Sequence, residues 1–549
     1  MADEKLEAAF LEELEALDKF RLSYSAQHTS VPLAHDDPDV RRMIEAMAFF
    51  TARTHLAAMR SLDASVLRIF RQHFPFLVGP VPAMAMLTAA PTSKFSEVTE
   101  LPRGVEVLVR KPVRTERGEP ERIFRFRTTS RLRILPIRID SVERYVLPSD
   151  DLRYVVRIAA NTAHNVELGD LRLHVNHVDD LRSSIMLHHA LRTQVERVTV
   201  HYGPNPRLDL DGEPCDVTFG PLPEEPEPDA FEQPLQRARL EMRFPQQGLF
   251  LHVGGLTPPR NWQHVTLCLD MKKSWPRQLH FTSDSLVLHT VPMINVRRDL
   301  ASPIECDGTR DSYAVKHPDA TARYALLWAV GAYKPSPDGF VPLAPGLFGD
   351  EGDSYEIVTD GAGEDRRARA MLRIQGAYRK PQMVAVDAFW HQPGLRSADL
   401  VEREVLLADR HVDAVKWSCP GRIVQSVEGT LDSLRDRQLQ LISMKSKRAL
   451  DKRDLTALLE ACGARGEEHY AKIIDAITDV GVEARPSGQR ENEEKQVYRI
   501  SFSRVDSMDI PNLLSYGQWL LALLRTWCAS RILEVVLQVP SLDAPIRCA

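Results

Sequence analysis

The sequence has no stretch of about 18 consecutive apolar residues, which a helix needs in order to cross a membrane. Its first residues, Met-Ala-Asp-Glu-Lys, are acidic and lead directly into a helical pattern, unlike the basic start of a secretory signal. The seven cysteines are scattered and odd in number, and no C-x-x-C pair occurs. We therefore expect a cytoplasmic protein with reduced thiols and no disulfide framework.

The chain also lacks a basic excess and the short motifs of common enzymes. Its net charge of −6 argues against a protein dominated by nucleic-acid binding. No G-x-x-x-x-G-K-[ST], G-x-G-x-x-G, G-x-S-x-G or H-E-x-x-H pattern occurs. His174, His177 and the pair His188–His189 have no carboxylate or cysteine at ligand spacing. We predict no catalytic, cofactor-binding or metal-binding residues, and hence no cofactor.

What the chain does have is length, since 549 residues are too many for one core and indicate three or four domains. The predicted class is α+β multidomain, with an N-terminal helical segment, central antiparallel β-rich modules and a C-terminal α+β domain. The predicted domains are residues 1–82 (helical segment), 83–290 (first β-rich domain), 291–411 (second β-rich domain) and 412–549 (C-terminal domain). An acidic, proline-rich loop is expected near residues 221–234.

Two helices are predicted in the N-terminal segment. The first covers residues 6–24 and has a narrow apolar stripe. The second begins at Asp37-Pro38-Asp39, where an acidic cap and a proline favour a helix start. The helical pattern of this second helix ends at His73-Phe74-Pro75. Because Ser61 or Asp63 can cap a new helix, we expect a break there.

The second helix is apolar on more than one side, and such a helix needs cover on more than one side. The predicted contact residues of the resulting bundle are Leu6, Phe10, Leu14, Val40, Met43, Ile44, Met47 and Phe50. The cover comes either from this chain, as a closed bundle, or from another subunit. The residues alone leave both interpretations open.

From Met84 onward the pattern changes from helical to strand-like. A strand is also expected within residues 240–252, and Asn295 is expected to hold a turn through its side-chain amide. After residue 412 the pattern predicts three helices and then a strand–strand–helix–strand ending, with the helices at residues 431–441, 452–462, 469–477 and 509–529.

Three motifs occur in order along the chain. The first motif consists of Asp37-Pro38-Asp39-Val40, then Ala48-Phe49-Phe50-Thr51-Ala52-Arg53, and then a proline-rich segment at the end of the helical pattern. The second is Leu101-Pro102-Arg103-Gly104 followed by Arg125-Phe126-Arg127-Thr128-Thr129. The third is Val291-Pro292-Met293-Ile294-Asn295-Val296. In their content and order these motifs resemble the TssF family, also called VasA or ImpG, of type VI secretion baseplate proteins. The chain departs from the family pattern around residues 61–64 and 410–449.

The resemblance implies a structural wedge subunit of a baseplate that docks and launches a contractile tail, with no reaction catalysed. It implies contacts with a TssG-like subunit, a second copy of this chain, TssK-like and TssE-like subunits, the spike and the sheath, and none with nucleic acid. The implied location is the cytoplasm, at the inner face of the cytoplasmic membrane, with membrane contact only through the assembled baseplate. The alternative is a multidomain β-rich enzyme, such as a carbohydrate-active protein, whose site no motif marks.

Overall fold

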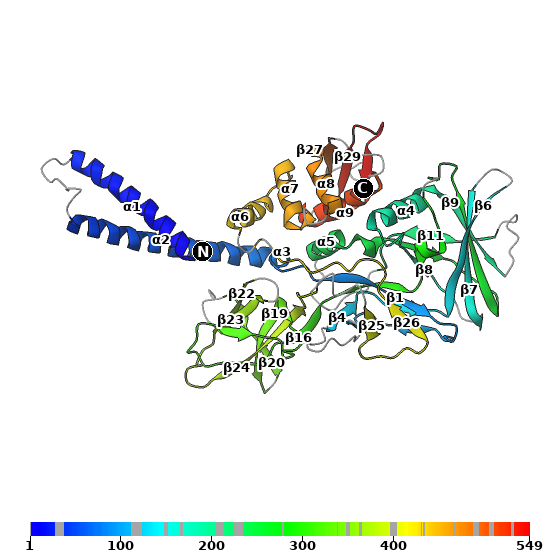
Figure 1. The fold of residues 1–549 in the computed structure, drawn as a ribbon, viewed down its shortest axis with the longest axis horizontal. Helices are drawn as coiled ribbons and strands as arrows, with labels where there is room; N and C mark the ends of the chain where they lie inside the picture. Colours follow the sequence, from blue (N-terminus) through cyan, green and yellow to red (C-terminus); the bar gives the residue numbers. More distant parts are fainter. Residues whose placement is uncertain are drawn as a thin grey trace, which may run out of the picture. The chain divides into compact units, whose positions relative to one another are not determined.

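The structure of the protein is a computed structural model (Figure 1). It describes the chain except for residues 1, 28–37, 111–122, 148–151, 165–167, 204–211, 224–233, 277–278, 338, 347–351, 362–364, 396–402, 430, 432–433, 465–467, 487–493, 504, 506–509, 529–531 and 549. The described chain forms two compact units: unit 1 is Met1–Val78 with Thr430–Ser446, and unit 2 is Gly79–Gly429 with Lys447–Ala549. Most of the expected acidic loop at 221–234 lies outside the described residues.

Unit 1 is helical and contains α1 (Ala2–Gln27), α2 (Pro38–His73), α3 (Pro75–Val78) and α6 (Arg435–Met444). α1 lies along α2 to form a helical hairpin, and α6 also contacts α2. The expected break at Ser61 or Asp63 is wrong, because α2 continues to His73. The Asp63 carboxylate does not cap a new helix but lies 3.1 Å from Nη1 of Arg435 on α6.

The first sheet of unit 2 has six strands in the order β25-β3-β4-β15-β1-β26. Within it β1 and β15 pair antiparallel, with Leu87 opposite Val291. Strands β3 and β4 alternate half-buried and buried side chains, as their sequence predicts. The bounds are β1 (Met84–Pro91), β3 (Glu106–Arg110), β4 (Ile123–Thr128), β15 (Thr290–Ile294), β25 (Glu404–Leu407) and β26 (Val415–Ser418), with a separate ladder of β2 (Thr99–Leu101) and β5 (Leu132–Ile134).

Two more sheets belong to the same β-rich region, in the orders β10-β9-β13-β7-β6 and β11-β12-β8-β14. The bounds are β6 (Ile137–Val146), β7 (Leu152–His164), β8 (Leu171–Val175), β9 (Val195–Tyr202), β10 (Glu213–Pro214), β11 (Asp216–Phe219), β12 (Phe250–Gly254), β13 (Trp262–Met271) and β14 (Leu286–Val287). Helix α4 (Leu181–Gln194) is capped by Asp180, whose side chain accepts a hydrogen bond from the Ser183 N–H.

The strand expected within residues 240–252 begins later than predicted. Residues Pro234–Arg243 form helix α5, a 3₁₀ turn covers Pro245–Gly248, and the strand β12 starts only at Phe250. The α5 sequence is rich in Leu, Gln, Arg, Glu and Met, which favour helices, and Pro234 suits a first helical position.

A third group of strands follows. One sheet has the order β16-β24-β19-β20, with β17 also on β24, and another has the order β18-β23-β22-β21. The bounds are β16 (Arg297–Leu300), β17 (Ile304–Cys306), β18 (Tyr313–Val315), β19 (Ala325–Ser336), β20 (Gly339–Pro342), β21 (Ala344–Pro345), β22 (Ser354–Asp360), β23 (Arg367–Arg373) and β24 (Gln382–His391). These strands enclose a hydrophobic core of their own around Val384, Val386 and Trp390.

The C-terminal region combines the sheet β27-β28-β29-β30 with three helices. Helix α9 contacts α4 and α5, and its Trp519 Nε1 donates a hydrogen bond to the Ala238 carbonyl of α5 at 2.6 Å. The bounds are α7 (Lys452–Ala461), α8 (Glu468–Asp475), β27 (Ile477–Pro486), β28 (Glu494–Phe502), α9 (Ile510–Cys528), β29 (Leu533–Gln538) and β30 (Ile546–Cys548). The predicted α+β multidomain class is confirmed. No helix in the described ranges is long and apolar enough to cross a membrane.

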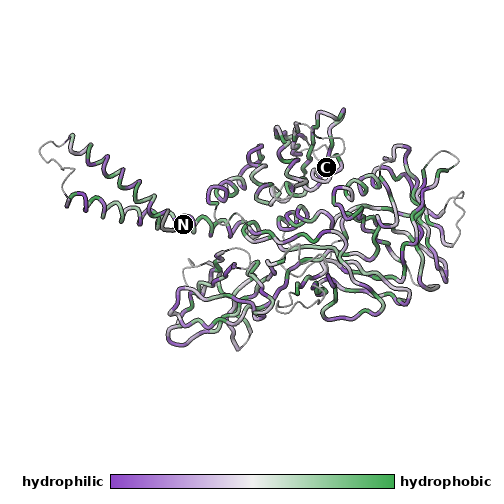
Figure 2. Tube along the Cα trace, in the orientation of Figure 1, coloured by the Kyte–Doolittle hydropathy of each residue, from purple (hydrophilic) through white to green (hydrophobic). Residues whose placement is uncertain are grey.

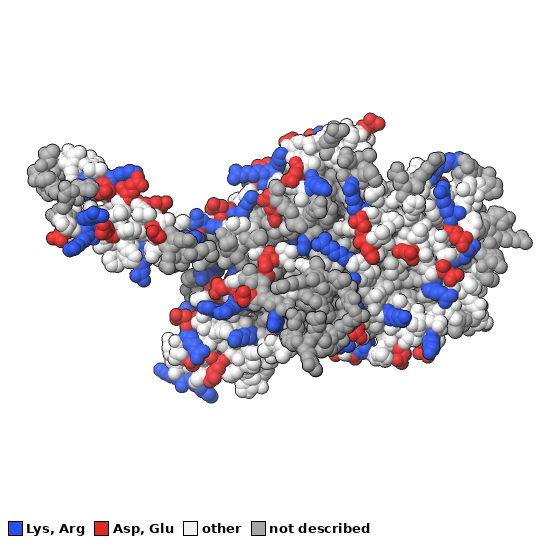
Figure 3. Space-filling model, viewed as in Figure 1, with Lys and Arg blue, Asp and Glu red and all other residues white. Residues whose placement is uncertain are grey.

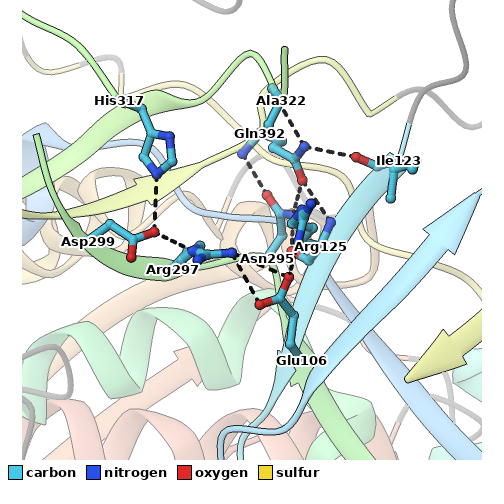
Figure 4. Close-up of polar contacts among 9 residues, drawn as sticks. All are labelled: Glu106, Ile123, Arg125, Asn295, Arg297, Asp299, His317, Ala322 and Gln392. Carbon is cyan, nitrogen blue, oxygen red and sulfur yellow. Dashed lines mark hydrogen bonds and ion pairs between the residues drawn. The ribbon is translucent and has the colours of Figure 1, made fainter. Parts of the chain in front are cut away.

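A buried pair of side-chain amides joins the first sheet to the third group of strands (Figure 4). Asn295 is 1% exposed, and its Nδ2 donates to the Arg125 carbonyl at 2.6 Å and to Gln392 Oε1 at 3.1 Å. Its Oδ1 accepts from the Gln392 N–H at 2.7 Å. Gln392 Nε2 in turn donates to the carbonyls of Ile123 and Ala322. The expected local turn is therefore wrong, because the Asn295 amide bonds to strands that are distant in sequence.

A chain of ion pairs lies beside these amides. Arg125 Nη1 lies 2.6 Å from the Glu106 carboxylate, and that hydrogen bond raises the pKa of Arg125 above its ordinary value. Glu106 also contacts Arg297 at 3.2 Å, Arg297 pairs with Asp299, and Asp299 lies 3.1 Å from His317 Nε2. At this junction the two side-chain amides are fully hydrogen-bonded, and charged side chains of alternating sign lie beside them. Such a network fixes the side chains in place.

We expect Asn295→Ala to lower the free energy of unfolding by about 3 kcal/mol, because the change leaves buried partners of both its amide N–H groups and its carbonyl unsatisfied. Asn295→Asp should cost at least as much, since its carboxylate would face the Arg125 and Gln392 oxygens without a donor. Urea unfolding followed by tryptophan fluorescence measures the loss. Gln382→Ala, at a half-buried position at the start of β24, is the control and should change stability little.

Buried histidines are held neutral in unit 2. The Nε2 atoms of His174 and His188 lie 3.1 and 3.2 Å from the carbonyl oxygens of Gln246 and Phe250, and burial lowers the pKa of each to about 4. Neither ring nitrogen of His391 has a hydrogen-bond partner among the described residues, and burial lowers its pKa to about 3. A ring nitrogen of His174 and one of His188 thus each lie at hydrogen-bonding distance from a backbone carbonyl.

These pKa values predict acid sensitivity. Between the ordinary value of 6.5 and the lowered pKa of about 3, the unfolded chain binds a proton at His391 that the folded chain does not. Stability therefore falls as pH falls, by about 1.4 kcal/mol per pH unit for such a histidine. Urea midpoints between pH 6.5 and 4.5 should fall less steeply in His391→Leu. The control His411→Leu replaces a histidine whose side chain is 89% exposed and should keep the wild-type slope.

Candidate interaction surface

α1 and α2 pack through a face to which α2 contributes small side chains. Ala48 and Ala52 are fully buried, with 0% of their surface exposed. His55 Nδ1 lies 3.4 Å from a Glu13 carboxylate oxygen, which sets the antiparallel register of the two helices. Small side chains at a helix crossing let the two backbones approach closely.

The eight residues predicted as bundle contacts fall into two groups. Met43, Met47 and Phe50 remain 65%, 52% and 64% exposed. The others are half-buried: Leu6, Phe10, Leu14, Val40 and Ile44. The structure does not bring all eight together. The register set by Glu13 and His55 places the start of α1 beside the second half of α2, whereas residues 40–50 lie in its first half.

The side of α2 opposite Ala48 and Ala52 carries a regular series of exposed residues. They recur at alternating spacings of four and three, which is the heptad spacing of a coiled-coil contact. We call this series the outer seam; it consists of Met43, Met47, Phe50, Thr54, Ala57, Ser61 and Ala64, all exposed. Of this series only Met43, Met47 and Phe50 were among the predicted contact residues, because threonine, alanine and serine give little apolar signal. The regular four–three spacing is the sequence signal that could have identified the others.

The outer seam contains no charged residue; Arg53 and Arg60 flank it. Figure 3 shows charged side chains of both signs on the hairpin, with uncharged surface between them. Thr54 Oγ1 donates to the Phe50 carbonyl at 2.8 Å, so this hydroxyl already has a partner and can be covered at little cost. Apolar and polar residues alternate along both helices (Figure 2), and most of the exposed large apolar side chains in the described chain lie in unit 1.

Substitutions of two alanines on opposite sides of α2 test which side packs against α1 and which side is exposed. Ala52→Leu inserts bulk into the α1–α2 contact and should destabilise the hairpin by about 1–3 kcal/mol, seen as an earlier loss of helical circular dichroism on heating. Ala57→Leu, on the outer seam, should leave the melting of the isolated chain unchanged. Equal destabilisation by both changes would show that the outer seam is already covered by this chain.

Metal-binding groups were also sought in the described ranges. They contain no group of three or more His, Cys, Asp or Glu side chains placed to hold a metal ion. The candidate site of this protein is a surface, formed by the outer seam and its flanking residues.

Comparison with known proteins identifies a structural component of the type VI secretion system. The sequence model described as "Type VI secretion system, TssF" matches residues 2–330, more than half of the chain. The chain belongs to the TssF family, and this membership makes it a structural subunit of the secretion baseplate. No curated protein sequence matches the chain.

Two solved structures share the fold. A chain of the type VI secretion TssK-TssF-TssG baseplate subcomplex matches with a TM-score of 0.75 and 18% identity, covering 93% of this chain and 98% of its own length. A chain of the type VI secretion baseplate complex matches with a TM-score of 0.62 and 18% identity, covering 99% and 98%. Both matches include the part of this chain that follows residue 330, so the fold extends beyond the region matched by the family model.

Proposed function

We propose that the helical hairpin of unit 1 is the assembly surface of this baseplate subunit, and that its outer seam packs against helices of a TssG-like subunit and of a second copy of this chain. The observation that carries the proposal is the outer seam itself: seven exposed, uncharged positions at heptad spacing. Burying the apolar side chains of such a face against another helix is favourable in free energy, whereas leaving them in water is not.

The outer seam also restricts what its partner helix carries. Met43, Met47 and Phe50 are large, whereas Ala57, Ser61 and Ala64 are small. Interfaces are stable when their facing layers fill the space between helices, so the partner carries small residues opposite Phe50 and larger ones opposite Ala57. Arg53 and Arg60 beside the outer seam favour acidic residues on the flanks of the partner.

Leu6, Phe10, Leu14, Val40 and Ile44 serve this surface indirectly. They are half-buried where α1 and α2 run together and hold the hairpin in its register.

The remaining partners are assigned to the chain on the basis of its relatives. The solved relative of the same fold is part of a complex with TssK and TssG, which supports both as partners here. We assign contacts with TssE-like subunits, the spike and the sheath to the β-rich parts of unit 2, whose strands present many surface loops. In this role the protein acts in the cytoplasm, near the inner face of the cytoplasmic membrane through the assembled baseplate, and catalyses no reaction.

Co-purification with a tagged TssG-like subunit encoded beside this chain tests the proposal. Phe50→Glu places a charge in the middle of the outer seam and should reduce recovery of this chain at least about tenfold, while the isolated chain keeps its melting temperature. Because Phe50 is exposed in this chain, its replacement costs little without a partner.

Phe340→Glu on β20 is the matched control, since Phe340 is 61% exposed and lies in unit 2. It should leave recovery unchanged. Full recovery of the Phe50→Glu chain would exclude the outer seam as the contact. These point changes are sharper than deletion of residues 1–78, which would also remove the helix that α6 contacts.

A further inference from the structure

Strand β23 of unit 2 carries a row of exposed arginines. Its Ala368 and Ala370 belong to the core of the third group of strands, so the alternate residues lie on the outer face of the sheet. Three of these outer residues, Arg367, Arg369 and Arg373, are exposed, and we call them the arginine row. Alternate Cα atoms of a strand lie about 6.8 Å apart, so the first two arginines are neighbours and the third lies about 14 Å further along.

The arginine row has no partner within the described part of the chain. Among those residues, no hydrogen bond or ion pair involves any of the three guanidinium groups. Other arginines of the same group of strands do have acidic partners: Arg298 lies 2.7 Å from Asp387, and Arg366 lies 3.3 Å from Glu428. Three like charges along one strand repel one another, and an anionic partner would replace this repulsion by attraction.

The two strands beside β23 complete the same face (Figure 1). On β22, Asp360 lies opposite the first arginine of the row, and Glu356 lies opposite Met371. On β18, the small Ala314 lies opposite the second arginine, and the exposed Lys316 occupies the next outward position. The face therefore carries a lysine beside the arginine row on one side and two carboxylates on the other, and its excess charge is positive.

We propose that the arginine row binds an acidic segment of a partner protein in the assembled baseplate. An extended segment repeats the side chains of one face at the same spacing of about 6.8 Å, so two carboxylates at alternate positions meet the first two arginines together. Met371, half-buried between the second and third arginines, faces an uncharged side chain of the segment. The proposal rests on the proposed function only for the choice of partners, and it concerns unit 2 rather than the outer seam.

The two carboxylates on this face favour a protein segment over a nucleic acid. Duplex DNA carries one negative charge per about 1.7 Å of its axis, so its phosphates would also be brought against Asp360 and Glu356. A short acidic segment places its few charges on the arginine row alone. The net charge of −6 for the whole chain also disfavours a polyanion as the partner.

Zero-length crosslinking tests which carboxylates the arginine row meets. Arg369→Lys keeps the positive charge and supplies an amine, which a water-soluble carbodiimide joins to a carboxylate in direct contact with it. The variant is assembled with the TssG-like, TssK-like, TssE-like and sheath subunits encoded beside this chain. We expect mass spectrometry to find the lysine introduced at position 369 joined to an Asp or Glu of one of these other proteins.

Arg260→Lys is the matched control, since Arg260 is also an exposed arginine of unit 2 but lies outside β23, just before β13. The lysine at position 260 should form no link to another protein. The proposal is overturned if the lysine at position 369 is joined only to carboxylates of this chain, such as Asp360, or to none, or if the control is linked to other proteins as often.

Charge reversal then measures the contact. Arg367→Glu combined with Arg369→Glu should reduce recovery of the linked protein about tenfold at about 0.15 M NaCl, and Arg260→Glu should not. Replacing the linked carboxylates by lysines should restore recovery with the doubly reversed chain, which a merely structural role of the arginines would not produce. Circular dichroism confirms that each variant folds.

Two further outcomes separate this proposal from its alternatives. If the isolated chain binds a fluorescein-labelled duplex DNA and the two charge reversals abolish that binding, the arginine row is a nucleic-acid surface and the proposal is wrong. A complex that forms normally but gives no link from position 369 contradicts only this proposal. Full recovery of the Phe50→Glu chain contradicts the role of the outer seam and leaves the link from position 369 as it is.

Discussion

A helix buries only those stripes of its surface that its neighbours reach, and this limit governs the helical unit of the protein. α2 uses Ala48 and Ala52 to approach α1, and that contact covers one side of a 36-residue helix. The outer seam lies on the opposite side, where α1 cannot reach it. α2 is therefore apolar on two sides, of which one is used inside the hairpin and the other is the one that we propose for assembly.

In unit 2 the structural constraint is different, because several β-sheets must be joined. Asn295 and Gln392 do so with side-chain amides that use their donors and acceptors on backbone groups and on each other. Such groups are stable in a buried position only when their polar atoms are paired, so the amides define how the strands meet. The third family motif, Val291 to Val296, contains this asparagine, which gives the motif a physical role in the junction.

The joining of sheets also explains a cavity of about 210 Å³ in unit 2. Where two cores meet, their side chains cannot fill all the space, and Leu132 and Leu171 border what remains. Charged residues in and just before β2, β5 and β8 then line the opening.

The sequence by itself determined the class of fold, the order of the motifs that mark the family, the start of α2 at Pro38 and its end before Pro75, because these depend on local propensity, capping and periodicity. Tertiary structure alone decided that α2 continues past Asp63, whose carboxylate finds Arg435 from a segment far along the chain. It also decided that α5 packs against α9 and that Asn295 bonds to Arg125 and Gln392. Those outcomes depend on partners distant in sequence, and no local pattern contains them.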